Sequence, residues 1–215
     1  MRRFYVGLDL GQSNDFTAIA VVEDTGEGDL HLRHLERYAL GTPYPEQADR
    51  VERLMRRPEL VATWTDPWEP TLKRALPVLV VDATGVGKAV VDLLKERNLR
   101  FEAVTITGGN SMGVSRGGVS VPKRDLVVAL EVPFHSGDLK VAEVLADWPA
   151  LKQELLSFRR KINLKTAHDS YEHWRFSDHD DLVLACALAC WKCRRLRGMR
   201  IVPKAMAGWP KPRGF

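Results

Sequence analysis

The sequence lacks a segment that could cross a membrane. No apolar run in its 215 residues approaches the roughly 20 residues that a bilayer requires. The start, Met1-Arg2-Arg3, leads into a strand-like segment and not into the apolar region of a signal peptide. We therefore expect a cytoplasmic protein with no membrane partner. Its 45% hydrophobic and 28% charged residues are typical of a single soluble domain.

Cysteine is also scarce. An odd number of three cysteines in a cytoplasmic protein argues against structural disulfides. Cys186, Cys190 and Cys193 have the C-x3-C-x2-C spacing of radical iron–sulfur enzymes, but those enzymes carry their cysteines on a loop. Residues 182–193 have helical character instead, which aligns the three thiols on one stripe of a helix. We interpret them as small core residues.

A complete nucleotide-binding loop is missing too. Residues 85–88 resemble the end of the pattern G-x-x-x-x-G-K-[ST]. However, Asp82 stands where the first glycine belongs, and Ala89 replaces the Ser or Thr that binds Mg²⁺. An acidic side chain there would repel the phosphates. The stretch therefore does not indicate an ATPase, and Gly85 and Gly87 are interpreted as the turn between a strand and a helix.

The charge is moderately basic. A net charge of +4 and a pI near 9.0 give modest support for a polyanionic partner. Basic residues cluster at 159–161 and 194–197 and recur between residues 200 and 213. For any single cluster, a solvated surface is the more common role.

The order of the expected elements points to one fold class. We expect strands at 4–11, 16–23 and 30–40, followed by a helix at 45–57. Two further strands, at 78–82 and 101–107, have a helix between them. The remaining helices are expected to start at Ser120-Pro122, to cover 148–162 and to start at Ser177. Residues 58–77 and 108–118 are expected to be irregular, and 171–176 to form a short strand. This order predicts an α/β fold of the ribonuclease H type. Its mixed five-stranded sheet joins a three-strand antiparallel meander to two parallel strands and is flanked by helices.

Four aspartates stand where this fold would bring them together. Asp9 ends the first strand, Asp82 ends the first parallel strand, and Asp180 and Asp181 open the last helix. Open sheets build sites at the carboxyl ends of their strands. Converging carboxylates can hold two Mg²⁺ or Mn²⁺ ions, which activate water and stabilise the leaving oxygen of a phosphodiester.

Each aspartate also has an ordinary interpretation. An aspartate at a strand end is more often a turn or cap residue, and Asp180 lies at capping-box spacing from Ser177. Asp181 shares a helical stripe with Ala185 and Leu188, which turns it toward packed structure, but Asp180 shares an apolar stripe as well. Helical geometry alone therefore leaves the principal ligand open. His179 is an auxiliary candidate for water activation or metal binding, although a histidine there is more often a neighbour of the helix cap.

The sequence resembles the nuclease domain of the large terminase subunit of tailed phages. The similarity lies in "VGLDLGQSNDFTAIAVV" around Asp9, "VVDATGVGKAVVDLL" around Asp82, "VSVPKRDLV" at residues 119–127 and "YEHWRFSDHDDLVLACALACW" ending at Trp191. These segments follow in order over nearly the whole chain. The last is the most specific, because an aromatic-rich strand, His-Asp-Asp and an apolar helix follow one another.

The resemblance implies a ribonuclease H-like endonuclease that cuts double-stranded DNA with two divalent ions during genome packaging. Asp9, Asp82 and Asp181 would bind the metals, with Asp180 as an auxiliary ligand. Lys123 and Arg124 would contact phosphate, unless they are only the basic start of a helix, and Lys88 would at most neighbour it. The nuclease domain would span 1–197, followed by a basic tail with prolines and glycines at 198–215.

The implied partners are DNA, a separate packaging ATPase, a small terminase and a portal in a phage or prophage system. A large terminase has an ATPase motor ahead of its nuclease, whereas the first expected strand begins close to Met1, so we expect no motor in this chain.

Two alternatives remain at the level of sequence. One is a non-catalytic docking or regulatory module of a packaging motor. The other is an actin-like or kinase-type ATP-binding domain, which also places Asp-x-Gly on a first strand, as Asp9-Leu10-Gly11 does. Those folds duplicate the domain to clamp a nucleotide, and 215 residues do not hold two copies.

Overall fold

The protein was analysed as a computed structural model that describes residues 1–11, 15–65, 71–85, 87–165 and 180–200. The strands are β1 (Arg3–Asp9), β2 (Ala18–Asp24), β3 (Leu30–Arg37), β4 (Ala62–Thr65), β5 (Leu72–Ala75), β6 (Val78–Asp82), β7 (Phe101–Thr107), β8 (Gly113–Ser115), β9 (Gly118–Pro122) and β10 (Leu139–Val141). The helices are α1 (Tyr44–Met55), η1 (Pro58–Leu60), α2 (Gly87–Glu96), α3 (Lys123–His135), α4 (Trp148–Lys165) and α5 (Asp181–Arg200).

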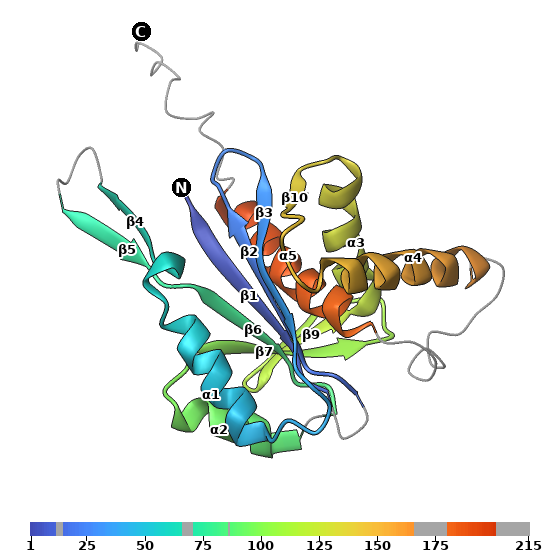
Figure 1. Cartoon of the computed structure of the whole chain (residues 1–215), viewed down its shortest axis with the longest axis horizontal. Coiled ribbons are helices and arrows are strands. Elements are labelled where there is room, and N and C mark those ends of the chain that lie inside the picture. The colour runs from blue at the N-terminus through green and yellow to red at the C-terminus, as the bar shows by residue number, and fades with distance from the viewer. Residues whose placement is uncertain (12–14, 66–70, 86, 166–179, 201–215) are drawn as a thin grey trace, which may run out of the picture.

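One mixed sheet organises the molecule, in the order β10-β3-β2-β1-β6-β7-β9-β8 (Figure 1). Strands β1, β2 and β3 form the expected antiparallel meander, and β6 and β7 continue from β1 in parallel. The ribonuclease H-like class is therefore confirmed. The count of five strands was too low, since β9, β8 and β10 extend the sheet to eight.

The additional strands lie in segments whose composition favours irregular structure. Residues 108–118 were expected to be a loop, yet β8 lies within them and pairs with β9. Residues 58–77 contain η1 and the hairpin formed by β4 and β5. The predicted helix cap at Ser120 was wrong: Ser120 lies in β9 opposite Thr105, and α3 begins only at Lys123.

Helices cover both faces of the sheet (Figure 1). Side chains of α1 and α2 share a core with one face, and those of α3, α4 and α5 share a larger core with the other. All three cysteines are buried in the second core, as predicted. Helix α5 runs to Arg200, past the start of the tail expected at 198, while residues 201–215 and the short strand expected at 171–176 lie outside the described part.

Helix α5 approaches the centre of the sheet unusually closely. A Cβ added to Gly7 in β1 would lie 2.0 Å from the carbonyl oxygen of Ala185 and 2.9 Å from the nitrogen of Ala189. Because both atoms belong to the helix backbone, they can move only if the helix moves. Glycine inside a strand often marks such a close approach of another backbone segment. Gly7 therefore fixes the distance between β1 and α5.

Candidate active site

Asp9 and Asp82 lie side by side at one edge of the sheet. Leu8 of β1 is in register with Val81 of the parallel strand β6, so the next residue of each strand, Asp9 and Asp82, stands at the same level. Side chains alternate along a strand, and Gly7, two residues before Asp9, faces α5. Both carboxylates therefore point to the face that α5 covers.

Asp181 reaches this edge from the helix. It lies one helical turn before Ala185, which packs on Gly7, and Asp9 lies two residues beyond Gly7 on the same side of β1. The contact between α5 and β1 thus carries Asp181 toward Asp9. Each of the three carboxylates is only 7% exposed, as expected for Asp181 from its helical stripe.

The backbone after β6 holds Asp82 in place. The Thr84 N–H donates to Oδ1 of Asp82 over 2.7 Å, and the Thr84 hydroxyl accepts from the Ile106 N–H on the neighbouring strand β7. Gly85 then adopts a φ of +84°, which glycine tolerates without strain. Of the two glycines expected in the turn, Gly85 lies there, whereas Gly87 is already the first residue of α2.

The electrostatics of Asp9 show that the carboxylates interact. Burial raises the pKa of Asp9 well above its ordinary value, and the charges of Asp82, Asp181 and Asp180 raise it further. A hydrogen bond with Asp82 acts in the same direction. The site therefore favours a bound cation, either protons or a metal ion.

The donor set suits a hard divalent cation, which prefers carboxylate oxygens. Within the described ranges, however, no three acidic, histidine or cysteine side chains are arranged to hold one metal ion together. The carboxylates thus share one edge of the sheet and one electrostatic environment without already forming a closed coordination cage.

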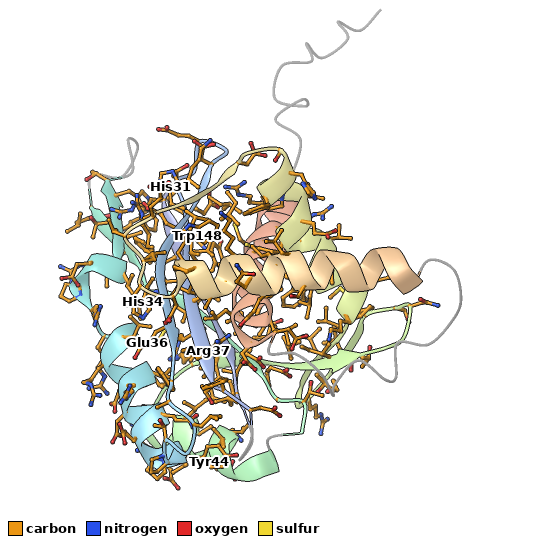
Figure 2. All side chains as sticks on the ribbon, turned by 45° about the vertical axis from the view of Figure 1, so that its right-hand side comes forward. His31, His34, Glu36, Arg37, Tyr44 and Trp148 are labelled. Carbon is orange, nitrogen blue, oxygen red and sulfur yellow. The ribbon has the colours of Figure 1, made fainter. Side chains whose placement is uncertain are left out.

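An arginine and a glutamate that sequence reasoning missed adjoin Asp181. Arg37, at the end of β3 (Figure 2), forms an ion pair with Glu154 of α4, and its Nη2 lies 3.9 Å from Oδ2 of Asp181. Glu154 in turn accepts a 3.0 Å hydrogen bond from the Val183 N–H in the first turn of α5. The two residues connect β3 and α4 to the helix start that carries Asp181. Their contacts join distant segments, so no local sequence pattern announces them.

The predicted phosphate-binding residues divide into two cases. Nζ of Lys123 lies 3.4 Å from Oδ2 of Asp180, so Lys123 borders the carboxylates directly. Arg124 is exposed and donates to Asn110 at its Oδ1 (3.1 Å) and its backbone oxygen (2.7 Å). Asp180 itself precedes α5 and is partly exposed, unlike the buried Asp181. His179, Ser177 and the side chain of Lys88 lie outside the described residues.

The basic cluster 194–197 is partly consumed by internal ion pairs. Arg197 forms two hydrogen bonds with the carboxylate of Asp24, of 3.0 and 2.6 Å, and Arg195 donates to Glu102 over 2.8 Å. Arg194 is exposed and forms no ion pair with any residue in the described part of the chain. In this cluster Arg195 and Arg197 therefore stabilise the fold, and Arg194 adds surface charge.

Comparison with solved structures agrees with the fold. The chain matches the zinc-bound large terminase nuclease of thermophilic phage G20c with a TM-score of 0.51 and 21% identity, over 87% of this chain and 80% of that one. It matches the Mn-soaked terminase nuclease domain of human cytomegalovirus with a TM-score of 0.51 and 14% identity, over 91% and 86%. The chain has a terminase nuclease-like fold.

The similarity is detected by comparing structures. No protein-family model and no curated protein matches the sequence. The ribonuclease H-like architecture expected from the order of elements is thus supported by the sheet and by the terminase nuclease folds alike. Within the described residues, none of the helices combines the length and apolar character of a membrane span.

Proposed function

We propose that this chain is a divalent-metal-dependent endonuclease that hydrolyses phosphodiester bonds of double-stranded DNA. The observation that carries the proposal is the burial of Asp9, Asp82 and Asp181 at one edge of the sheet. Three carboxylates buried in mutual repulsion cost stability unless cations compensate them. A cost of this kind is typical of a functional site. The terminase nuclease-like fold and the net charge of +4 support DNA as the substrate.

In this proposal Asp9, Asp82 and Asp181 hold the metal ions, and Asp180 assists them. Two Mg²⁺ or Mn²⁺ ions bound there would supply an activated water and stabilise the leaving 3′ oxygen. The Thr84 N–H orients Asp82, and the Arg37–Glu154 pair orients the start of α5. Lys123 compensates Asp180 and lies where a DNA phosphate would approach the carboxylates. In a cell this chain would act in the cytoplasm of a bacterial host, beside a packaging ATPase, a small terminase and a portal.

Cleavage of supercoiled plasmid tests the proposal. We expect nicking and then linearisation in the presence of Mn²⁺ or Mg²⁺, with little sequence preference and with complete inhibition by a chelator. Asp82→Asn and Asp181→Asn should each abolish cleavage and leave the thermal unfolding transition intact. Plasmid that stays supercoiled across a titration of both metals would reject the nuclease and favour a docking module. Activity retained by either variant would remove that residue from the site.

A further inference from the structure

Two hollows meet at Arg124. The smaller, of about 50 Å³, is lined by Thr107, the glycine pair 108–109, Asn110, Lys123 and Arg124. It lies beside the carboxylates, because Lys123 also contacts Asp180. The larger, of about 530 Å³, lies between α3 and α5 and shares Arg124 with the first. We call the larger hollow the α3–α5 groove.

The walls of the α3–α5 groove come from one stripe of each helix. On α3, Arg124 and Val128 are one turn apart and both exposed, Val128 by 41%. On α5, Trp191, Arg194 and Arg195 share the facing stripe. The groove therefore lies between the first two turns of α3 and the last turns of α5, and its α5 wall is well removed from Asp181 at the start of that helix.

The charge of the groove suits a polyanion. Three arginines line it, against a single acidic residue, Asp125. Arg124 is held in place by its hydrogen bonds to Asn110, and Arg195 by its ion pair with Glu102 and by the Trp191 ring, 5.4 Å from its guanidinium carbon. Arg194 is exposed and lies on the α5 side of the groove, away from the carboxylates. Fixed guanidinium groups lose little conformational entropy on binding a phosphate, and each still has further N–H donors.

We propose that the α3–α5 groove binds the phosphate backbone of the DNA beyond the scissile bond. One strand would pass from the carboxylates over Lys123 and Arg124 and continue along the groove to Arg194. The exposed Val128 and Met112, 41% exposed each, would lie against the sugars. The inference rests on the proposed nuclease function for its choice of ligand, but it concerns where DNA binds and not how it is cut.

Binding measured without cleavage tests this inference. The protein would carry Asp82→Asn, and fluorescence anisotropy would follow a labelled duplex long enough to cover the groove and a short duplex that covers only the carboxylate edge. Replacing both Arg124 and Arg194 by Ala should weaken binding of the long duplex about tenfold, the loss expected for hydrogen bonds to charged groups. The slope of log K against log salt should fall by about 0.9 for each DNA phosphate that the variant no longer neutralises. Arg194→Ala alone should affect only the long duplex.

The matched control is Arg56→Ala, an exposed arginine that follows α1 on the opposite face of the sheet and should leave binding unchanged. Wild-type affinity and salt slope for the long duplex in the double variant would overturn the inference. The inference would also be overturned if the protein bound poly-glutamate instead of the duplex and if that binding required Arg124 and Arg194, because the groove would then fit an acidic protein. Plasmid cleavage and groove binding can fail separately. If DNA binding depends on Arg194 but the protein does not cleave plasmid, only the proposed nuclease function is rejected. If the protein cleaves plasmid but DNA binding does not depend on Arg194, only the groove is rejected.

Discussion

Asp9 occupies a position that a charged side chain does not normally tolerate. It is 7% exposed, and its pKa is raised first by burial and then by the neighbouring carboxylates. A buried aspartate in such surroundings lowers the stability of the folded state when it ionises. Proteins accept such a cost mainly where a residue is needed for binding or catalysis. The residue therefore offers a direct test of cation binding that does not depend on DNA.

Replacing Asp9 by Asn removes the buried charge but keeps the shape of the side chain. In a chelator at about pH 7, where an ordinary aspartate is ionised, we expect Asp9→Asn to be more stable than the wild-type protein, because the raised pKa of Asp9 means that its ionised form destabilises the folded state. Added Mn²⁺ should raise the melting temperature of the wild type much more than that of the variant. Equal stabilisation of both by Mn²⁺ would separate Asp9 from the cation site. Scanning calorimetry measures both effects.

Gly7 is the second residue with a specific consequence. Any larger side chain must displace the backbone of α5, since its Cβ would lie 2.0 Å from the Ala185 oxygen. We expect Gly7→Ala to destabilise the fold by about 3 kcal/mol or to prevent folding, as for overpacked cores. Gly198→Ala is the control, because it lies in the same helix with no atom within 4 Å of its Cβ position, and alanine favours helix. Urea denaturation would compare the two, and equal effects would contradict the close packing.

At the scale of elements, the buried side chain of Glu154 links α4 to the start of α5, in addition to the apolar contacts between the two helices. Glu154 balances the charge of Arg37, whose Nη2 lies 3.9 Å from Asp181. In Glu154→Gln that charge is no longer balanced, and Arg37 should compete with the cation for Asp181. We expect about tenfold more Mn²⁺ to be needed for half-maximal cleavage, as for other groups that orient metal ligands. Saturating Mn²⁺ should restore most of the rate.

Glu143→Gln provides the matched control for this change, since Glu143 is exposed. Both variants should unfold in one cooperative transition in urea. Glu154→Gln should have the lower free energy of unfolding, because it changes a buried side chain. An unchanged Mn²⁺ requirement in Glu154→Gln would leave Glu154 with only a structural role. A rate that Mn²⁺ fails to restore would point to misfolding of the α5 start.

The other end of α5 is tied to β2 by an ion pair between the buried Asp24 and the partly exposed Arg197. Burial by itself would raise the pKa of Asp24, but hydrogen bonds from Arg197 and from the Gly26 N–H hold that pKa below its ordinary value. A lowered pKa adds stability that is present above the unfolded-state value and is lost as the pH falls through the folded-state value. The stability of the wild type should therefore fall in acid, from about pH 4 downwards.

Arg197→Met should remove that contribution and leave the carboxylate of Asp24 buried without its main cation. We expect a loss of about 3 kcal/mol near neutral pH, the size found when one partner of a buried pair is removed. The difference between wild type and variant should shrink in acid, where Asp24 is protonated in both. Urea denaturation at several pH values measures this, and a difference that does not depend on pH would show that packing, not charge, is responsible.

The sequence predicted the elements that have a clear hydrophobic pattern and missed the short strands that form by pairing with neighbouring strands. Strand β6 and helix α5 have uniform apolar runs, so Asp82 and Asp181 could be assigned to their ends. Strands β8 and β10 have three residues each and gain their stability from neighbouring strands. Gly7, in a buried strand opposite the small residues Ala185 and Ala189, is a signal that could have indicated the helix contact. Arg37 and Glu154 had no such local signal.

At the scale of the whole molecule, the architecture bears on the alternative of an ATP-binding domain. ATP-binding folds of the actin and kinase type clamp the nucleotide between two related halves, whereas the described residues form one eight-stranded sheet and one small hairpin. We expect calorimetric titration with ATP to give no saturable heat beyond metal chelation. The control is the same titration with a DNA duplex in the Asp82→Asn variant, which should bind. Saturable ATP binding at micromolar concentration would favour the kinase-like alternative.

The contact between β1 and α5 also determines when the candidate site can form during synthesis. Asp9 is translated near the beginning of the chain, whereas Asp181 follows only after the strands of the sheet have been made. Helix α5 packs on β1 and β2, and its start brings Asp181, with Asp180 just before it, toward Asp9. A nascent or truncated chain that ends before α5 would therefore have only Asp9 and Asp82 of the three buried carboxylates of the candidate site, and the site would be incomplete. The proposed activity would therefore arise only once α5 has been translated and has packed on the sheet.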